Sequence, residues 1–248
     1  MTIRLLILAL LSLSLLLPAA DGKIPVLLIG GQNNHDWQKA NAFLMAFLAN
    51  QKHLAVEESN APPNKASKEA WAAWKPDFSK YGAVLLNYNG EMWPDETKAA
   101  LEKYLNDGGG VMPLHAANNS FTGWNGFEQA VGLLWRGKDF GASVFFDEAG
   151  KLQREEKNQG RGMGHGGQYD WKMTVRDTAN PITVGMPVNW IHRYDELDHG
   201  QRGPAEKLNI LLSAFSEQTR VQAGAILGNL QGLARETVST LYIANAPI

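Results

Sequence analysis

Runs of consecutive apolar residues alternate with stretches of helical apolar spacing through the first half of the chain. Residues 23–31 form a continuous apolar run closed by two glycines, and residues 81–88 and 111–114 form two more. Runs of this kind predict strands that are buried on both faces, as in a parallel sheet. Residues 54–57 predict a further, shorter strand.

Between these strands the apolar residues recur at helical spacing. One predicted helix buries a face made of five residues: Ala40, Phe43, Leu44, Phe47 and Leu48. A second begins near Pro94, carries Asp95 and Glu96 in its first turn, and ends at Gly108. The alternation of strands and helices predicts right-handed crossovers and an α/β fold whose parallel sheet is covered on both sides.

The pattern loosens in the second half of the chain. Residues 127–134 predict a short helix, and residues 136–168, rich in glycine and charge, predict a long excursion. Long irregular segments in compact domains are usually functional or disordered. Strands are predicted at residues 169–175 and 208–214, with a loop at residues 190–196.

The N-terminus has the pattern of an export signal. Arg4 precedes an apolar run over residues 5–17, which Pro18 ends, and small residues follow at the expected cleavage site. The run is too short for a comfortable membrane span. We expect a signal peptide at residues 1–22, a periplasmic or secreted product without a stable membrane span, and one domain over residues 23–248.

Composition narrows the partners and the chemistry. The 248-residue chain is 44% hydrophobic and 19% charged, with a net charge of −2. This balance gives no reason to expect nucleic acid or an anionic membrane as a partner. The chain has no cysteine, which excludes disulfides, thiolate metal sites and a cysteine nucleophile.

Polar side chains follow three of the predicted strands, at the point where each strand ends. These residues are Asn33, Asn34 and His35 after the first strand, Asn89 after another, and His115 and Asn118 after the central one. In a doubly wound sheet the carboxyl ends of the strands meet at one edge, where ligands bind. His115 is therefore a candidate general base, a metal ligand or a hydrogen-bonding wall residue.

Other candidates lie outside the predicted sheet. His165 lies in the glycine-rich excursion and could close over a site. Asp195 and Glu196 could supply a carboxylate for acid–base work or for a metal, although no HExxH-type spacing supports a metal site. Trp124 lies near the polar clusters and could stack on a sugar ring or simply pack in the core.

With these residues assembled, the chain resembles the trehalose-utilisation (ThuA-like) family. The matching segments are IGGQNNHDW (29–37), VLLNYNGEMWPDE (84–96), GGGVMPLHAANNSF (108–121), GMGHGG (162–167) and the stretch from Asn180 to Ala214. The resemblance implies a class I glutamine amidotransferase-like fold, a flavodoxin-like sandwich with a mostly parallel central sheet. Amidotransferases of that fold keep a catalytic cysteine after the central strand, where this chain carries His115, so glutaminase chemistry is excluded.

The resemblance also implies carbohydrate catabolism, with 3-keto glycosides as a proposed substrate class. The characteristic polar positions of the family map to five residues here: His35, His115, His165, Asp195 and Glu196. The similarity stops after about Thr219, and residues 220–248 lack the elements with which the family continues. This departure indicates a frameshift or a divergent C-terminus.

Three functions fit these observations. The leading hypothesis is an exported enzyme that acts on (3-keto) glycosides or disaccharides by histidine-mediated acid–base chemistry. Its catalytic residues would be His115, His35, Asp195 and Glu196, and its substrate-binding residues Asn33, Asn34, Asn89, Asn118, Trp124 and His165. The alternatives are a hydrolase that uses a divalent metal, with candidate ligands His35, His115 and His165, and a sugar-binding module without catalysis.

Overall fold

The computed structural model describes residues 22–147, 149–216 and 221–228. Four parallel strands form the first sheet, in the order β2-β1-β3-β4. They are β1 (Ile24–Gly30), β2 (Leu54–Asn60), β3 (Ala83–Leu86) and β4 (Gly110–Pro113). Because this is the order of a flavodoxin-like sheet, it confirms the predicted α/β class with a parallel central sheet.

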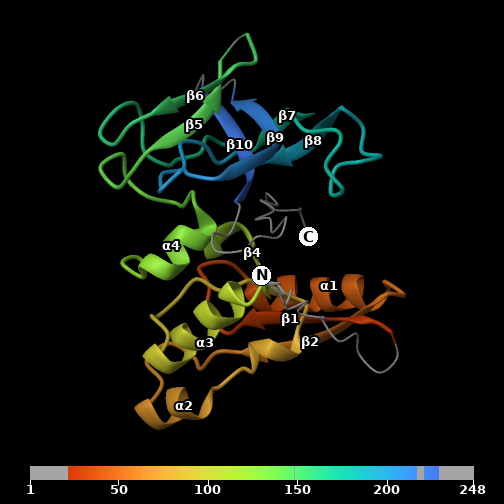
Figure 1. The fold of residues 1–248 in the computed structure, drawn as a ribbon, viewed down its shortest axis with the longest axis vertical. Helices are drawn as coiled ribbons and strands as arrows, with labels where there is room; N and C mark the ends of the chain where they lie inside the picture. Colours follow the sequence, from red (N-terminus) through yellow and green to blue (C-terminus); the bar gives the residue numbers. More distant parts are fainter. Residues whose placement is uncertain (1–21, 148, 217–220, 229–248) are drawn as a thin grey trace, which may run out of the picture.

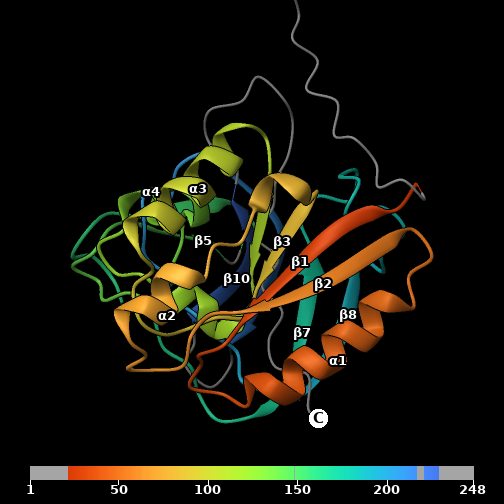
Figure 2. The same ribbon diagram turned by 90° about the horizontal axis from the view of Figure 1, so that it is seen from below.

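Helices cover both faces of the parallel sheet, as expected. Figure 2 shows α1 (Trp37–Ala49) on one side and α2 (Lys68–Ala73) and α3 (Asp95–Asn106) on the other. The pleat divides the core accordingly. Leu28 packs with residues of α1, whereas Leu27 and Ile29 belong to the larger cluster on the α3 side.

Three consecutive glycines, Gly108 to Gly110, lead from α3 into β4, and the first two are required for different structural reasons. Gly108 has a φ of +103°, the left-handed conformation that ends many helices. Gly109 packs so closely against Tyr104 that a Cβ at this position would come within 2.2 Å of the ring. Only glycine fits here. The Tyr104 hydroxyl donates to the carbonyl of Gly110 and accepts from its N–H, at 3.0 and 2.9 Å. The turn into β4 is thus fixed from both sides.

The predicted inner face of α1 is wrong by about one position. Phe43 and Phe47 are 58% and 54% exposed, and their rings stack on one another with centroids 6.2 Å apart. Leu44 and Leu48 pack on the sheet, together with the buried Asn41. Asn41 donates to Glu58 and accepts from Asn87, so a polar network sets the rotation of the helix where apolar spacing alone suggested another.

The second half of the chain forms a separate antiparallel sheet, with the order β10-β9-β7-β8. Its strands are β7 (Tyr169–Val175), β8 (Asn189–Asp195), β9 (Leu208–Ser216) and β10 (Val221–Gly228). The predictions of β7 and β9 are confirmed, whereas the predicted loop at residues 190–196 is wrong. Figure 1 shows this sheet stacked above the parallel layer.

Short elements connect the two layers. After β4 come the 3₁₀ turn η2 (His115–Asn119) and helix α4 (Asn125–Val131), whereas a further 3₁₀ turn, η1 (Phe78–Lys80), precedes β3 within the parallel layer. Strands β5 (Ser143–Phe146) and β6 (Leu152–Glu155) form a hairpin. Figure 1 shows α4 between the layers, so the chain passes from one layer to the other just after His115.

Two of the expected segments fall largely outside the described residues. These are the export signal over residues 1–22 and the atypical tail over residues 220–248, of which only residues 22 and 221–228 are described. Within the tail, β10 pairs antiparallel with β9. No helix in the described ranges has the length and apolar character needed to cross a membrane.

Candidate functional site

The polar residues that follow the parallel strands do meet at one edge of the sheet. Asn89, beyond the end of β3, donates its side-chain amide to Asn34 at 2.8 Å. His115, just after β4, lies against His35, and their ring centroids are 4.6 Å apart. The geometry therefore brings together residues from three strand ends, as the parallel topology requires.

The two histidines form a direct pair. Their Nε2 atoms are 3.0 Å apart, so one ring donates a proton and the other accepts it. The side chain of His115 is only 18% exposed, whereas His35 is exposed. Burial, followed by the neighbouring imidazoles of His35 and His165, lowers the pKa of His115 from 6.5 to about 4. His115 is consequently neutral at pH 7.

The backbone of His115 is held in an uncommon conformation. Its φ of +42° lies in the left-handed region, which residues other than glycine adopt only when the surrounding structure imposes it. The guanidinium of Arg136 supplies part of that constraint by donating to the carbonyls of Asn119 and Ser120, at 3.0 and 2.8 Å. The turn after β4 is thus braced from behind.

A carboxylate that the sequence did not single out faces the other side of the His115 ring. Oδ2 of Asp198 lies 3.6 Å from Nδ1 of His115, and Asp198 is only 7% exposed. A buried carboxylate at this position favours the tautomer that carries its proton on Nδ1. The only available signal was an acidic residue beside His199, in a segment whose position relative to β4 the pattern did not reveal.

Asp195 and Glu196 have different partners from those expected. Asp195 lies 2.9 Å from Nε2 of His192 and accepts from the backbone N–H of Glu196, while burial raises its pKa. Glu196 lies 3.8 Å from Nδ1 of His165. Asp198, rather than Asp195, is therefore the carboxylate beside His115.

His165 is presented by a firmly anchored segment. Gly164 and His199 exchange backbone hydrogen bonds at 3.0 and 2.8 Å, and the ring of His165 lies 5.8 Å from that of Trp135. Arg202, which is fully buried, donates to the carbonyls of Arg161 and Gln159. These hydrogen bonds fix the glycine-rich segment to the residues that follow β8.

A cavity of about 570 Å³ opens at the same sheet edge. Nine residues line it: Gly31, Gln32, Asn33, Asn34, Trp37, Asn64, Asn89, Gly90 and Glu91. Asn33 donates to Asn87, Gln32 donates to Glu91 and Asn89 donates to Asn34, so most of these amides are held by hydrogen bonds. Three of the predicted substrate-binding residues, Asn33, Asn34 and Asn89, line this cavity.

The sequence matches the ThuA family model, described as trehalose utilisation, over residues 25–229. The chain belongs to the ThuA family. A ThuA-like protein from Parabacteroides merdae ATCC 43184 is 31% identical, with a TM-score of 0.79 over 89% of this chain and 78% of that one. No curated protein matches the sequence.

Two further solved structures align with lower scores. A ThuA-like protein from Bacteroides uniformis ATCC 8492 is 12% identical, with a TM-score of 0.49 over 77% of this chain and 67% of that one. The glutaminase domain of CTPS from Trypanosoma brucei, with bound acivicin, is 7% identical, with a TM-score of 0.40 over 83% and 81% of the two chains.

Two expected substrate-binding residues have structural positions in this ThuA chain. Asn118 is 1% exposed, donates to the carbonyl of Leu133 and accepts from the N–H of Trp135. Trp124 is 6% exposed, packs in the main core and donates to Glu102 at 2.5 Å. Neither side chain lines the amide-rich cavity.

The metal candidates are only partly brought together. His35 and His115 are adjacent, and His165 is close enough to lower the pKa of His115, while its own ion-pair partner is Glu196. Across the described part of the chain, no three histidine or acidic side chains are placed so that they could hold a metal ion. The arrangement instead provides a neutral buried imidazole, a carboxylate behind it and an exposed imidazole in front.

Proposed function

We propose that this member of the ThuA family is an exported enzyme that cleaves a neutral 3-keto glycoside by acid–base chemistry at His115. The observation that carries the proposal is the His35–His115 pair, together with an amide-rich cavity whose lining includes Asn34, the residue next to His35 in the chain. The association of the family with trehalose utilisation supports a saccharide as the substrate.

The lining of the cavity supports an uncharged sugar. Side-chain amides act as both donors and acceptors, as sugar hydroxyls do, and the indole of Trp37 offers an apolar surface for a sugar ring. Glu91 is the one charged residue among the nine that line the cavity. A phosphorylated sugar would meet this carboxylate and no lysine or arginine among the nine lining residues, which favours an unphosphorylated substrate.

His115 is suited to remove a proton from carbon. With the proton of the neutral ring on Nδ1, toward Asp198, the lone pair on Nε2 is directed toward His35. The hydrogen at C2 of a 3-keto sugar is acidified by the neighbouring carbonyl. Proton transfer from C2 to Nε2 gives an enolate and an imidazolium, which the carboxylate of Asp198 stabilises.

His35 completes the proton balance. With substrate bound, His35 takes the neutral tautomer that carries its proton on Nδ1, so its Nε2 accepts the proton from Nε2 of His115 across 3.0 Å while its Nδ1–H is donated to the glycosidic oxygen. The C1–O bond breaks as the electron pair of the enolate forms the C1–C2 double bond. The products are an alcohol and an unsaturated keto sugar, to which water can add, so no covalent enzyme intermediate is required.

The assay uses the full chain with 3-keto-trehalose and follows release of glucose. We expect turnover by the wild type, its loss in His115→Ala, and slower turnover when C2 of the keto sugar carries deuterium. Equal turnover by wild type and His115→Ala would remove His115 from the mechanism. Full turnover with no deuterium effect would replace elimination by direct hydrolysis.

The same preparation tests the two other functions. Saccharide binding without turnover, measured by calorimetry, would identify a sugar-binding module, for which the hydrogen-bonded amides of the cavity are also suitable. Activity that is abolished by a chelator and restored by Zn²⁺ would identify a metal-dependent hydrolase. Detection of the processed protein in the periplasm or medium would test export.

A further inference from the structure

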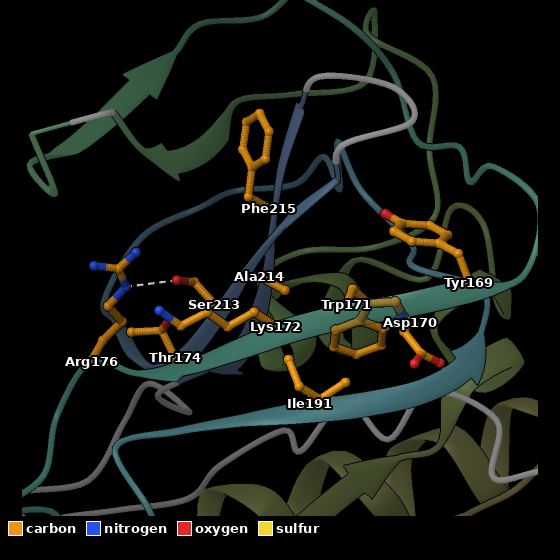
Figure 3. A pocket seen from close by; sticks show the side chains of 10 residues that line it. All are labelled: Tyr169, Asp170, Trp171, Lys172, Thr174, Arg176, Ile191, Ser213, Ala214 and Phe215. Carbon is orange, nitrogen blue, oxygen red and sulfur yellow. Dashed lines mark hydrogen bonds between the residues drawn. The ribbon is translucent and has the colours of Figure 1, made fainter.

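A second cavity lies on the antiparallel sheet, on strands different from those that carry the His35–His115 pair. It measures about 280 Å³ and is lined by residues of β7, β8 and β9 together with Arg176 (Figure 3). None of its lining residues is shared with the amide-rich cavity. The proposed reaction gives this cavity no role.

The pleat of β7 directs a row of polar side chains to this face. Trp171, Met173 and Val175 are buried, so the alternate residues Lys172 and Thr174 point to the opposite side. Strand pairing extends the row sideways. Thr174 lies opposite Ser213 of β9, and Lys172 lies opposite Ile191 of β8.

The cavity carries positive charge that is not neutralised. Arg176 donates its Nε–H to the hydroxyl of Ser213 at 2.6 Å, and its guanidinium lies 4.2 Å from the centre of the Phe146 ring. Its two terminal nitrogens make no hydrogen bond within the described ranges. In the same ranges, neither Arg176 nor Lys172 forms an ion pair.

The only acidic residue of the cavity is already engaged. Asp170 accepts from the guanidinium of Arg193 and from the backbone N–H of Tyr194, and the bond with Arg193 lowers its pKa. Its negative charge is therefore directed to Arg193. This leaves the two cations of the cavity available to a ligand.

Apolar surface lies beside the charges. Phe215 and Ile191 are 50% and 49% exposed, and both line the cavity near Lys172. Arg176 lies four positions after Lys172, which corresponds to about 13 Å along an extended chain. A ligand that matches this surface is extended, offers apolar ring faces and hydroxyls, and carries negative groups on more than one unit.

We propose that this face binds an acidic oligosaccharide, whose carboxylate or sulfate groups pair with Lys172 and Arg176. The hydroxyl of Thr174 would meet a sugar hydroxyl, the buried Ser213 would hold Arg176 in place, and Phe215 would stack on a ring. The site is separate from the amide-rich cavity. It would hold the proposed enzyme on a charged glycan while the neutral substrate reacts at the His35–His115 pair.

Affinity electrophoresis and calorimetry with the full chain test this site. The probes are oligogalacturonides for carboxylates, a sulfated oligosaccharide for sulfates, maltooligosaccharides as the neutral control, and poly-glutamate as an acidic peptide. We expect binding to one or both acidic glycans that weakens with salt. We also expect no binding to the neutral glycan, and weaker binding to poly-glutamate.

The variant Lys172→Ala/Arg176→Ala should lose at least tenfold in affinity, and Phe215→Ala should weaken binding without changing its salt dependence. The control Lys52→Ala/Lys68→Ala removes the same charge from the parallel layer and should bind as the wild type does. His115→Ala should also bind normally, which separates this proposal from the proposed reaction. Equal binding by the Lys172/Arg176 variant and the wild type would overturn the site, as would a preference for poly-glutamate.

Discussion

The Nε2 atoms of His35 and His115 lie 3.0 Å apart, although the two histidines are 80 positions apart in the chain. The contact exists because β1 and β4 are parallel strands on either side of β3, so their carboxyl ends open onto the same edge. It joins an exposed imidazole to a largely buried one. A proton taken up inside the site therefore has a short path to its mouth.

Replacing Asp198 should impair catalysis more than replacing Asp195. Asp198→Asn removes the charge that faces Nδ1 of His115, so we expect kcat to fall by roughly 10²–10⁴-fold. Asp195→Asn is the matched control, because Asp195 faces His192 instead. Steady-state kinetics of both variants on 3-keto-trehalose provide the measurement. Equal losses in the two variants would argue against a positioning role for Asp198.

Removing His35 should raise the pKa of His115. The imidazole of His35 is one of the two charges that lower this pKa, after burial. In His35→Gln we expect the NMR titration midpoint of His115 to move from about 4 toward its ordinary value of 6.5. An unchanged midpoint would mean that burial and His165 set the pKa without His35. Turnover should fall in the same variant, because the leaving oxygen loses its proton donor.

The stability of the protein should fall as pH drops below 6.5. The pKa of His115 is about 4 in the folded state and near 6.5 in the unfolded state, so between these values the unfolded chain binds more protons. His115 therefore lowers the free energy of unfolding progressively from pH 6.5 to 4, by up to about 3 kcal/mol. Urea unfolding across this range should show a weaker pH dependence in His115→Asn.

Arg202 should contribute strongly to stability. It is fully buried, pairs with Glu155 at 3.1 Å and donates to several carbonyls of the glycine-rich excursion. Arg202→Met leaves these acceptors without a donor, and we expect a loss of about 3–5 kcal/mol in urea unfolding. Arg193→Met removes an exposed ion pair and should cost about 0–1 kcal/mol. Similar losses in both variants would contradict the anchoring role.

The sequence was sufficient for the parallel layer because three of its four strands lie in apolar runs, and the parallel topology predicted that the polar loops carrying His35 and His115 share one edge. It was insufficient for the antiparallel layer. The apolar residues of β8 (Trp190, Ile191 and Tyr194) do not alternate with its polar ones, and Ile191 and Tyr194 are exposed, so its pattern resembled a loop. Asp198 was missed for a related reason, since its approach to His115 depends on how the two layers stack. The rotation of α1 depended on Asn41, a buried polar residue that apolar spacing cannot register.

Gly109 should not tolerate a side chain, although its backbone conformation would allow one. A Cβ there would lie 2.2 Å from the ring of Tyr104, which is itself fixed by two hydrogen bonds to Gly110. We expect Gly109→Ala to reduce the free energy of unfolding by about 1–3 kcal/mol, the usual cost of overpacking. Gly164→Ala is the control, because its Cβ would meet the nearest atom, in His199, at an ordinary 3.5 Å.

Combining Gly109→Ala with Tyr104→Leu should cost less than the sum of the two changes, since the smaller side chain makes room for the methyl group. Strict additivity in urea unfolding would show that the ring does not determine the requirement for glycine at the entrance to the strand that carries His115.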